Sequence, residues 1–135
     1  MDDIKLTLSK NPNLRSQTIE EEARWMNQEG PLYYTLSRNK PLRAEAGCWV
    51  YFIKGGQLAG RARAERIGKA SELHPEPLFS YSGKELEQHP DNYEVECKTM
   101  EVASHPIPHK GFQGFRYVLS EEVRAFENAF RKRGS

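Results

Sequence analysis

Two arginines two positions apart, Arg61 and Arg63, are the residues whose type and spacing point most directly to chemistry. They fall in a stretch where small apolar residues alternate with arginine, which is typical of a strand with one cationic face. Two guanidiniums on one face can each donate a fork of N–H groups to phosphate or carboxylate oxygens. The alternative interpretation is a solvated sheet face in which both arginines pair with Glu94 and Glu96.

Aromatic side chains stand close to this arginine pair in the sequence. Trp49 and Tyr51 share one face of an apolar run and Val50 and Phe52 share the other, so at least one face must be core. An aromatic ring at the mouth of a curved sheet can stack on a base, which contributes about 1–3 kcal/mol per base in single-strand binders. Trp49 is therefore a candidate ligand contact, and its alternative role is ordinary core packing.

A second candidate contact surface is the stretch GFQGFR at residues 111–116. Its glycines permit a ligand to approach the backbone closely. Gln113 can match both a donor and an acceptor on a base edge, while Phe112 and Arg116 add a ring and a cation. The alternative is a glycine-mediated bulge with Phe112 or Phe115 in the core.

The basic hairpin, the basic link before it and the aromatic and glycine loop together define one candidate ligand site. Its predicted members are Lys40, Arg43, Trp49, Arg61, Arg63, Phe112, Gln113 and Arg116. No Ser/His/Asp or Cys/His arrangement follows from the spacing, so we assign no catalytic residue. His105 and His109 are four apart, but the two prolines between them forbid a helix, so we expect no metal site and no cofactor.

The chain's length and composition predict one ordinary, rather polar globular domain. It has 135 residues, and with 37% hydrophobic and 29% charged residues it is neither disordered nor fibrous. No run of about 18 apolar residues is present, and the N-terminus lacks the pattern of a signal peptide, so we expect a cytoplasmic protein without membrane contact. Cys48 and Cys97 are far apart and predict a reduced, buried pair.

Charge is unevenly distributed although the net charge is only +1. Residues 38–69 hold eight basic and two acidic residues, and residues 70–101 hold two basic and eight acidic residues. One interpretation is an anion-binding face backed by an acidic one. The other is that the two segments are neighbours in a sheet and pair with each other.

The helices that must support these residues have recognisable start signals. Thr18-Ile19-Glu20-Glu21 fits a capping box and predicts a helix to about Gln28, which Gly30-Pro31 ends. Ser120 predicts the N-cap of a closing helix with Val123, Phe126 and Phe130 on one face. A short helix beginning near Ser82 is also expected.

Strands are expected in alternating or β-branched segments, and one of these forms a hairpin around a Gly55-Gly56 turn. The segments are 3–8, as an edge strand, 32–36, 48–53, the return arm to about 67, 93–102 and 112–119. The alternation changes phase near Thr99, which predicts a bulge. Two prolines in 105–111 predict that no regular strand forms there.

These elements predict an α+β fold: a strongly curved, mostly antiparallel sheet or small pseudo-barrel with two to three flanking helices. We expect residues 1–135 to form a single domain. Within it, 1–30 is a strand and helix extension, 31–131 is the core and 132–135 is a frayed tail.

The layout resembles the PUA-like superfamily of small pseudo-barrels, which includes PUA, ASCH, EVE and YTH domains. The resemblance covers roughly residues 32–131 and lies in three features: the hairpin GCWVYFIKGGQLAGRARAERI after the short strand PLYYTLS, the strand YEVECKTMEV with the turn SHPIPHKGFQGFRYV, and the closing helix. It is a likeness of layout, and it implies a pseudo-barrel whose mouth binds a ligand. EVE and YTH domains bind a modified base there in an aromatic cage.

ASCH domains carry a Gly-x-Lys-x-x-Glu-x-Arg type signature before this hairpin. In the corresponding stretch Lys40 matches, Arg38 replaces the glycine, and Arg43 and Glu45 occupy the last two positions in swapped order. The resemblance therefore implies, as an alternative, a small hydrolase or ribonuclease acting on a modified nucleoside or RNA, with Lys40 and Glu45 as its polar centre.

The sequence thus predicts a non-catalytic binding module for a nucleic acid or a nucleotide-like ligand. The near-neutral charge argues against avid duplex binding, which draws on many phosphate contacts, and favours a single-stranded end, a modified base or a free nucleotide. Besides the hydrolase, the remaining alternative is a protein-interaction or regulatory module that uses its charge-segregated faces.

Overall fold

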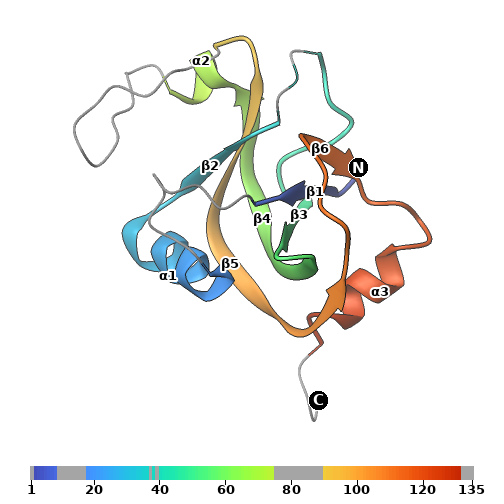
Figure 1. Ribbon diagram of the computed structural model, residues 1–135. Coiled ribbons are helices and arrows are strands. Elements are labelled where there is room, and N and C mark those ends of the chain that lie inside the picture. The colour runs from blue at the N-terminus through green and yellow to red at the C-terminus, as the bar shows by residue number, and fades with distance from the viewer. Residues whose placement is uncertain (1, 9–17, 37, 39, 75–89, 132–135) are drawn as a thin grey trace.

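The computed structural model describes residues 2–8, 18–36, 38, 40–74 and 90–131. Six strands form one strongly curled sheet in the order β2-β5-β4-β3-β1-β6 (Figure 1). Their bounds are β1 Ile4–Thr7, β2 Leu32–Thr35, β3 Trp49–Lys54, β4 Gln57–Lys69, β5 Tyr93–Pro108 and β6 Phe115–Tyr117. The helices are α1 Ile19–Glu29, α2 Ala70–Leu73 and α3 Val123–Asn128. The α+β prediction of a curved sheet with flanking helices is confirmed.

The hairpin β3–β4 forms around the Gly55-Gly56 turn, as predicted. Gly55 and Gly56 adopt φ of 62° and 76°, the left-handed conformation that a two-residue hairpin turn requires and that glycine adopts without strain. Trp49 lies opposite Arg63, and Tyr51 lies opposite Arg61. The two arginines therefore lie on the same face of the sheet as the two aromatic residues.

Both faces of this sheet are packed, because residues alternate along β3 between two hydrophobic clusters. Val50 and Phe52 lie in the cluster that includes Ile19, Ala23 and Met26 of α1. Tyr51 and Ile53 lie in a second cluster with Phe126 and Phe130, from α3 and the turn after it. Helices α1 and α3 thus cover opposite faces, and the arginine face is the one that α3 covers.

Strand β1 lies inside the sheet, not at its edge as predicted. It pairs in parallel with β3 and antiparallel with β6, so a strand from the end of the chain closes over it. The cause is long-range, since Phe115–Tyr117 returns to cover the free side of Ile4–Thr7. Residues 2–8 and 18–30 therefore belong to the sheet and its packing rather than forming an extension to a core of residues 31–131.

Strand β5 continues through the proline segment where no regular strand was expected. Leu58 pairs with Ile107, and His109 N–H donates to the Gly56 carbonyl, whereas His105 N–H donates to the Ala129 carbonyl after α3. Pro108 falls in the phase opposite to His109, where no ladder bond to β4 needs its missing N–H. The predicted bulge near Thr99 is confirmed, since the β4–β5 register shifts between Cys97 and Met100.

Helix α1 begins as predicted, with the Thr18 hydroxyl accepting a hydrogen bond from Glu21 N–H at 3.1 Å. Helix α3 is shorter than predicted, because its N-cap is Glu122 and not Ser120. The Glu122 carboxylate accepts from Leu119 N–H and from a lysine on β1, which holds residues 119–122 as a turn. The predictions near Ser82 and for 132–135 lie outside the described residues.

Among the described residues no helix is long and apolar enough to cross a membrane. Cys48 and Cys97 are both free and buried. Burial raises the pKa of Cys48 to about 11 and also raises the pKa of Cys97, so both thiols stay protonated at neutral pH. They act as small core side chains.

Candidate functional site

An alternating stack of guanidiniums and rings stands on the arginine face of the hairpin. The Cζ atoms of Arg61 and Arg63 lie 3.9 and 3.7 Å from the centre of the Trp49 ring. Two guanidiniums this close to one ring centre cannot share a face, so the indole is held between them. Arg61 also contacts the ring of Phe130, 4.5 Å away. We call Arg63, Trp49, Arg61 and Phe130 the arginine–tryptophan column.

The two arginines of the column make few hydrogen bonds. Arg61 Nη2 donates to Glu101 at 3.4 Å, and Arg63 Nη1 donates to the carbonyl of Gly47 at 2.9 Å. Arg61 Nε is buried and has no partner in the described part of the chain. The predicted alternative, pairing with Glu94 and Glu96, is therefore wrong in its partners for these two arginines.

The acidic strand residues pair elsewhere, at the far end of β4 and β5. Arg66 Nε and Nη2 bind Glu96 at 3.0 and 2.8 Å, and the Tyr33 hydroxyl donates to the same carboxylate at 2.6 Å. These hydrogen bonds lower the pKa of Glu96 to about 2. Glu94 binds the ring of His74 at 2.6 Å. Basic and acidic segments thus pair across the sheet here, and Arg61 of the column joins that pairing through Glu101 on β5.

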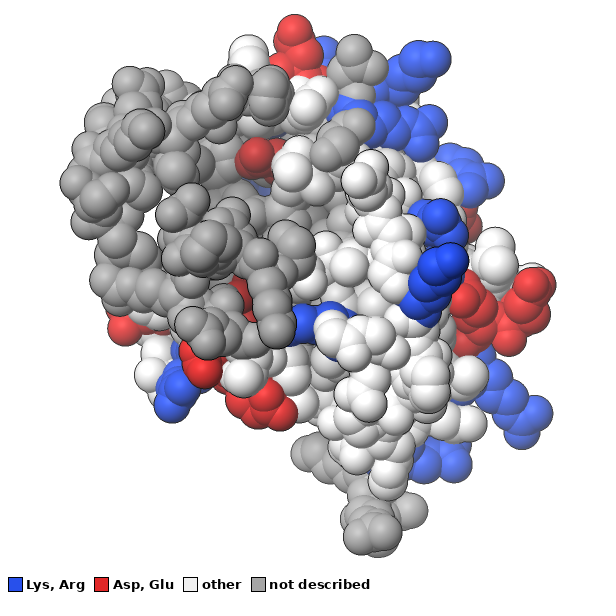
Figure 2. Space-filling model, viewed as in Figure 1, with Lys and Arg blue, Asp and Glu red and all other residues white. Residues whose placement is uncertain are grey.

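A second arginine group surrounds the edge strand β6. Arg38 lies over Phe115 at 5.8 Å, Arg43 over Tyr117 at 4.1 Å and Arg116 over Phe112 at 4.7 Å. In Figure 2, Lys and Arg side chains gather at the upper right, over the loop before β3 and over β6. We call Arg38, Arg43, Phe112, Phe115, Arg116 and Tyr117 the β6 surface. Phe115 and Tyr117 pack against the cluster under α1 and Phe112 against the cluster under α3, so the β6 surface wraps around the edge of the sheet.

Six of the eight predicted site residues fall into two groups. Trp49, Arg61 and Arg63 meet in the column, and Arg43, Phe112 and Arg116 belong to the β6 surface. Lys40 and Gln113 are exposed. Glu45, the predicted partner of Lys40 in a hydrolytic centre, is exposed as well.

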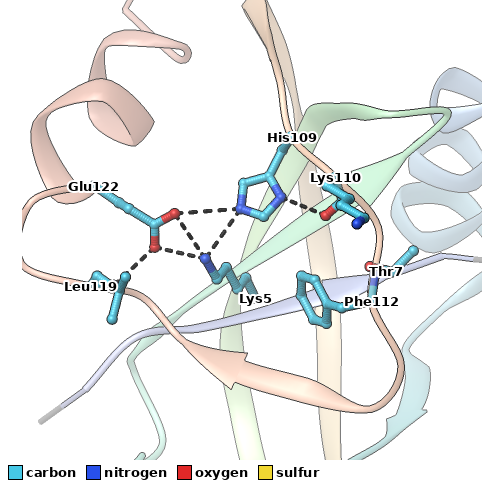
Figure 3. A network of polar contacts seen from close by, with 7 residues as sticks. All are labelled: Lys5, Thr7, His109, Lys110, Phe112, Leu119 and Glu122. Carbon is cyan, nitrogen blue, oxygen red and sulfur yellow. Dashed lines mark hydrogen bonds and ion pairs between the residues drawn. The ribbon is translucent and has the colours of Figure 1, made fainter.

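Sequence reasoning missed a polar cluster beneath α3 (Figure 3). Lys5 on β1 is almost fully buried, and its Nζ lies 2.7 and 2.8 Å from the Glu122 oxygens and 3.1 Å from His109 Nε2. His109 Nδ1 donates to the Lys110 carbonyl at 2.8 Å, so Nε2 is left as the acceptor for the ammonium. No local signal could have revealed this cluster, because Lys5 lies more than a hundred positions from both His109 and Glu122.

Lys5, His109 and Glu122 have a structural role, and we call these three residues the clamp. The three N–H donors of the Lys5 ammonium are matched by the three acceptors, so none is left to contact a ligand. Burial acts to raise the pKa of Glu122, but the hydrogen bonds from Lys5 and Leu119 N–H outweigh it, and the pKa is lowered. The clamp fastens the start of α3 to β1 and to the segment after β5.

Groups of three or more His, Cys, Asp or Glu side chains placed to hold a metal ion do not occur in the described parts of the chain. No family model, curated protein or solved structure matches this chain. Function is therefore inferred from the geometry of its cationic and aromatic surfaces.

Proposed function

We propose that the protein is a binding module for a nucleic acid or a nucleotide-like ligand, and that the ligand meets it at the arginine–tryptophan column. The observation that supports this most is the stacking of Arg63 on Trp49 at 3.7 Å, at the exposed end of the column. One face of the guanidinium rests on the indole, and the solvent-exposed side of Arg63 is accessible to a second flat group.

A nucleobase is the flat group that suits such a guanidinium. Bases released from a duplex stack on arginine planes as well as on aromatic rings, and each stacked base contributes about 1–3 kcal/mol. Both faces of Trp49 are covered by Arg61 and Arg63, so in this proposal the indole holds the guanidiniums flat and Arg63 receives the base. The column thereby reduces the conformational freedom that Arg63 would lose on binding.

The phosphate of the ligand is assigned to the remaining N–H groups of the same two arginines. Arg61 binds Glu101 and the Tyr51 side chain, whereas in the described chain Arg63 donates to the Gly47 carbonyl alone, which leaves its other donors for phosphate oxygens. The buried, unpartnered Nε of Arg61 is a donor that an oxyanion reaching into the column would satisfy. The resemblance to PUA-like pseudo-barrels, which bind ligands at the mouth, supports the same class of ligand.

The direct experiment is a fluorescence anisotropy titration of a labelled single-stranded oligonucleotide against wild type, Arg63→Ala and Arg24→Ala. Arg24 is an exposed arginine of α1, on the other face of the sheet, so its removal matches the charge change without touching the column. We expect Arg63→Ala to weaken binding about ten-fold or more, the loss of about one stacked base, and Arg24→Ala to bind like wild type.

Two outcomes would contradict the proposal. One is the absence of binding by wild type to nucleotides, modified nucleosides and single- or double-stranded oligonucleotides at low salt. The other is equal weakening by both variants, which would indicate unspecific charge attraction. If none of these nucleotides, nucleosides and oligonucleotides binds, the protein-interaction alternative is favoured. If the protein turns over a modified nucleoside and Lys40→Ala loses that turnover, the hydrolase is favoured.

A further inference from the structure

The β6 surface presents flat cations on aromatic rings in the same manner as the column. We propose that it binds the neighbouring nucleotides of the chain held at Arg63, so that the ligand is a single-stranded nucleic acid several nucleotides long. This inference rests on the proposed function and deepens it, because a free mononucleotide would need the column alone.

Arg43 is the best-exposed platform of the β6 surface. Its Cζ lies 4.1 Å from the centre of the Tyr117 ring, and 70% of its side chain is exposed. Asp2 binds Arg43 Nε at 3.2 Å, which orients the guanidinium, and among the described residues no side chain is shown paired with its Nη groups. A guanidinium stacked in this way offers a plane to a base and an edge to a phosphate.

The column and the β6 surface are joined by one continuous piece of backbone. Arg63 donates to the carbonyl of Gly47 at 2.9 Å, and Gly47 ends the loop that carries Arg43. At the other end, Arg43 N–H donates to the Tyr117 hydroxyl at 3.0 Å. The loop therefore spans from the end of the column to the edge strand, and both arginine platforms are fixed to it.

The separation of the two surfaces sets the length of the ligand. Between Arg63 on β4 and Arg116 on β6 lie three strand spacings of about 4.8 Å each, or about 14 Å across the sheet. A ligand that contacts both surfaces must follow this path along the sheet, which favours an oligonucleotide over a mononucleotide. Single-strand binding proteins cover about 4–16 nucleotides per small barrel, so several nucleotides fit this distance.

The charge of these segments matches a phosphate backbone. Residues 38–47 and 109–118 together contain five lysines and arginines and one acidic residue, although the whole chain is nearly neutral. Two separate guanidinium planes favour a strand whose bases are splayed out, because the bases of a duplex are already stacked on each other. A single strand is therefore favoured over a duplex.

The test is the gain in affinity with ligand length, measured as the ratio of the dissociation constants of a mononucleotide and a hexanucleotide. Uridine and deoxythymidine series at one salt concentration cover RNA and DNA, and a duplex of the same length is included. We expect a ratio of about ten or more for wild type and for Arg24→Ala, since each added stacked base contributes about 1–3 kcal/mol. We expect a clearly smaller ratio for Arg43→Ala and Arg116→Ala.

Arg43→Lys separates stacking from charge, because lysine keeps the cation and lacks the plane. A reduced ratio in Arg43→Lys supports stacking at Tyr117. The inference is overturned if mononucleotide and hexanucleotide bind equally in wild type, if Arg43→Ala and Arg116→Ala keep the full ratio, or if the duplex binds more tightly. An equal, Arg63-dependent affinity for both lengths would leave the proposed function standing, whereas no binding at any length would remove both.

Discussion

Arg61 shows how one residue can be both a cation and a packing element. Its guanidinium lies between the rings of Trp49 and Phe130, and only 15% of its side chain is exposed. Its stem and plane therefore fill the space between β3 and the turn after α3. This packing explains why an arginine is tolerated with one buried nitrogen unpartnered.

Replacing Arg61 should destabilise the protein through lost packing as well as lost charge. Each cation–π contact contributes about 0.5–2 kcal/mol, so losing the contacts to Trp49 and Phe130 in Arg61→Ala should lower the free energy of unfolding by about 1–3 kcal/mol. Arg61→Met, which keeps a long apolar stem over both rings, should recover part of that loss. Urea denaturation of the three proteins measures this, and equal stability of Arg61→Ala and wild type would contradict the packing role.

The Glu96 carboxylate should contribute a stability that depends on pH. Arg66 and Tyr33 lower its pKa from 4.5 to about 2, so the folded state binds this proton less readily than the unfolded state. The contribution is fully present above about pH 5 and is lost as the pH falls from about 4.5 towards 2. The urea midpoint of wild type minus that of Glu96→Gln should shrink over this range. A difference that stays constant with pH would show that Glu96 acts only through its shape.

At the scale of elements, the position of α3 depends on contacts from distant parts of the chain. The helix has six residues, too few to be stable alone, and it is held by Phe126 and by the pairing of Glu122 with Lys5. Phe130 lies in the turn after the helix and contacts Arg61 at one end of the column. The position of α3 therefore also determines the position of Arg61.

Breaking the clamp should loosen α3. Lys5→Met leaves the Glu122 carboxylate without its cation, and loss of one partner of a buried pair costs about 3–5 kcal/mol, reduced to about 2–4 here because Glu122 is partly exposed. The double variant Lys5→Met/Glu122→Leu should recover most of that stability, since neither charge is then left unpaired. Urea unfolding and amide exchange of residues 123–128 measure both effects. Lys5→Met with wild-type protection in α3 would contradict the clamp.

Local signals predicted the elements that local forces build. The Thr18 cap, the Gly55-Gly56 turn and the bulge near Thr99 are each set by neighbouring residues, and all three are present. The wrong predictions concern elements whose position is set by segments distant in the sequence. β1 is internal because β6 covers it, and the N-cap of α3 is Glu122, whose carboxylate Lys5 binds.

At the scale of the molecule, the near-neutral net charge and the small basic patches predict that affinity for a single strand falls only moderately as the salt concentration rises. With about three or four phosphate contacts, at Arg63, Arg43 and Arg116 among others, a single strand should show a slope of log affinity against log salt of about −2 to −3. Anisotropy titrations at several salt concentrations give this slope. A slope near zero would argue against phosphate contacts, and a much steeper one would point to more contacts than these surfaces provide.

The candidate site could be predicted from the sequence only in part. The pairing of Trp49 with Arg61 and Arg63 depends on the hairpin turn and also on a bulge, because the β3–β4 register shifts by one residue between Ile53 and Phe52. The turn glycines alone would place Trp49 opposite Ala62. The contacts of Phe130 with Arg61 and of Tyr117 with Arg43 join segments about seventy positions apart, and no periodicity encodes such contacts. Sequence therefore identified the arginines but not the separation of their two surfaces.

The central claim is that Arg63 receives a nucleobase as a flat, stacked cation. The most direct measurement is the affinity of Arg63→Lys for a single-stranded oligonucleotide, compared with wild type and Arg24→Ala by anisotropy at one salt concentration. Lysine keeps the charge and lacks the plane, so we expect Arg63→Lys to bind about ten-fold more weakly, close to Arg63→Ala, while Arg24→Ala matches wild type. Arg63→Lys binding as tightly as wild type, or no binding by wild type, would contradict the account.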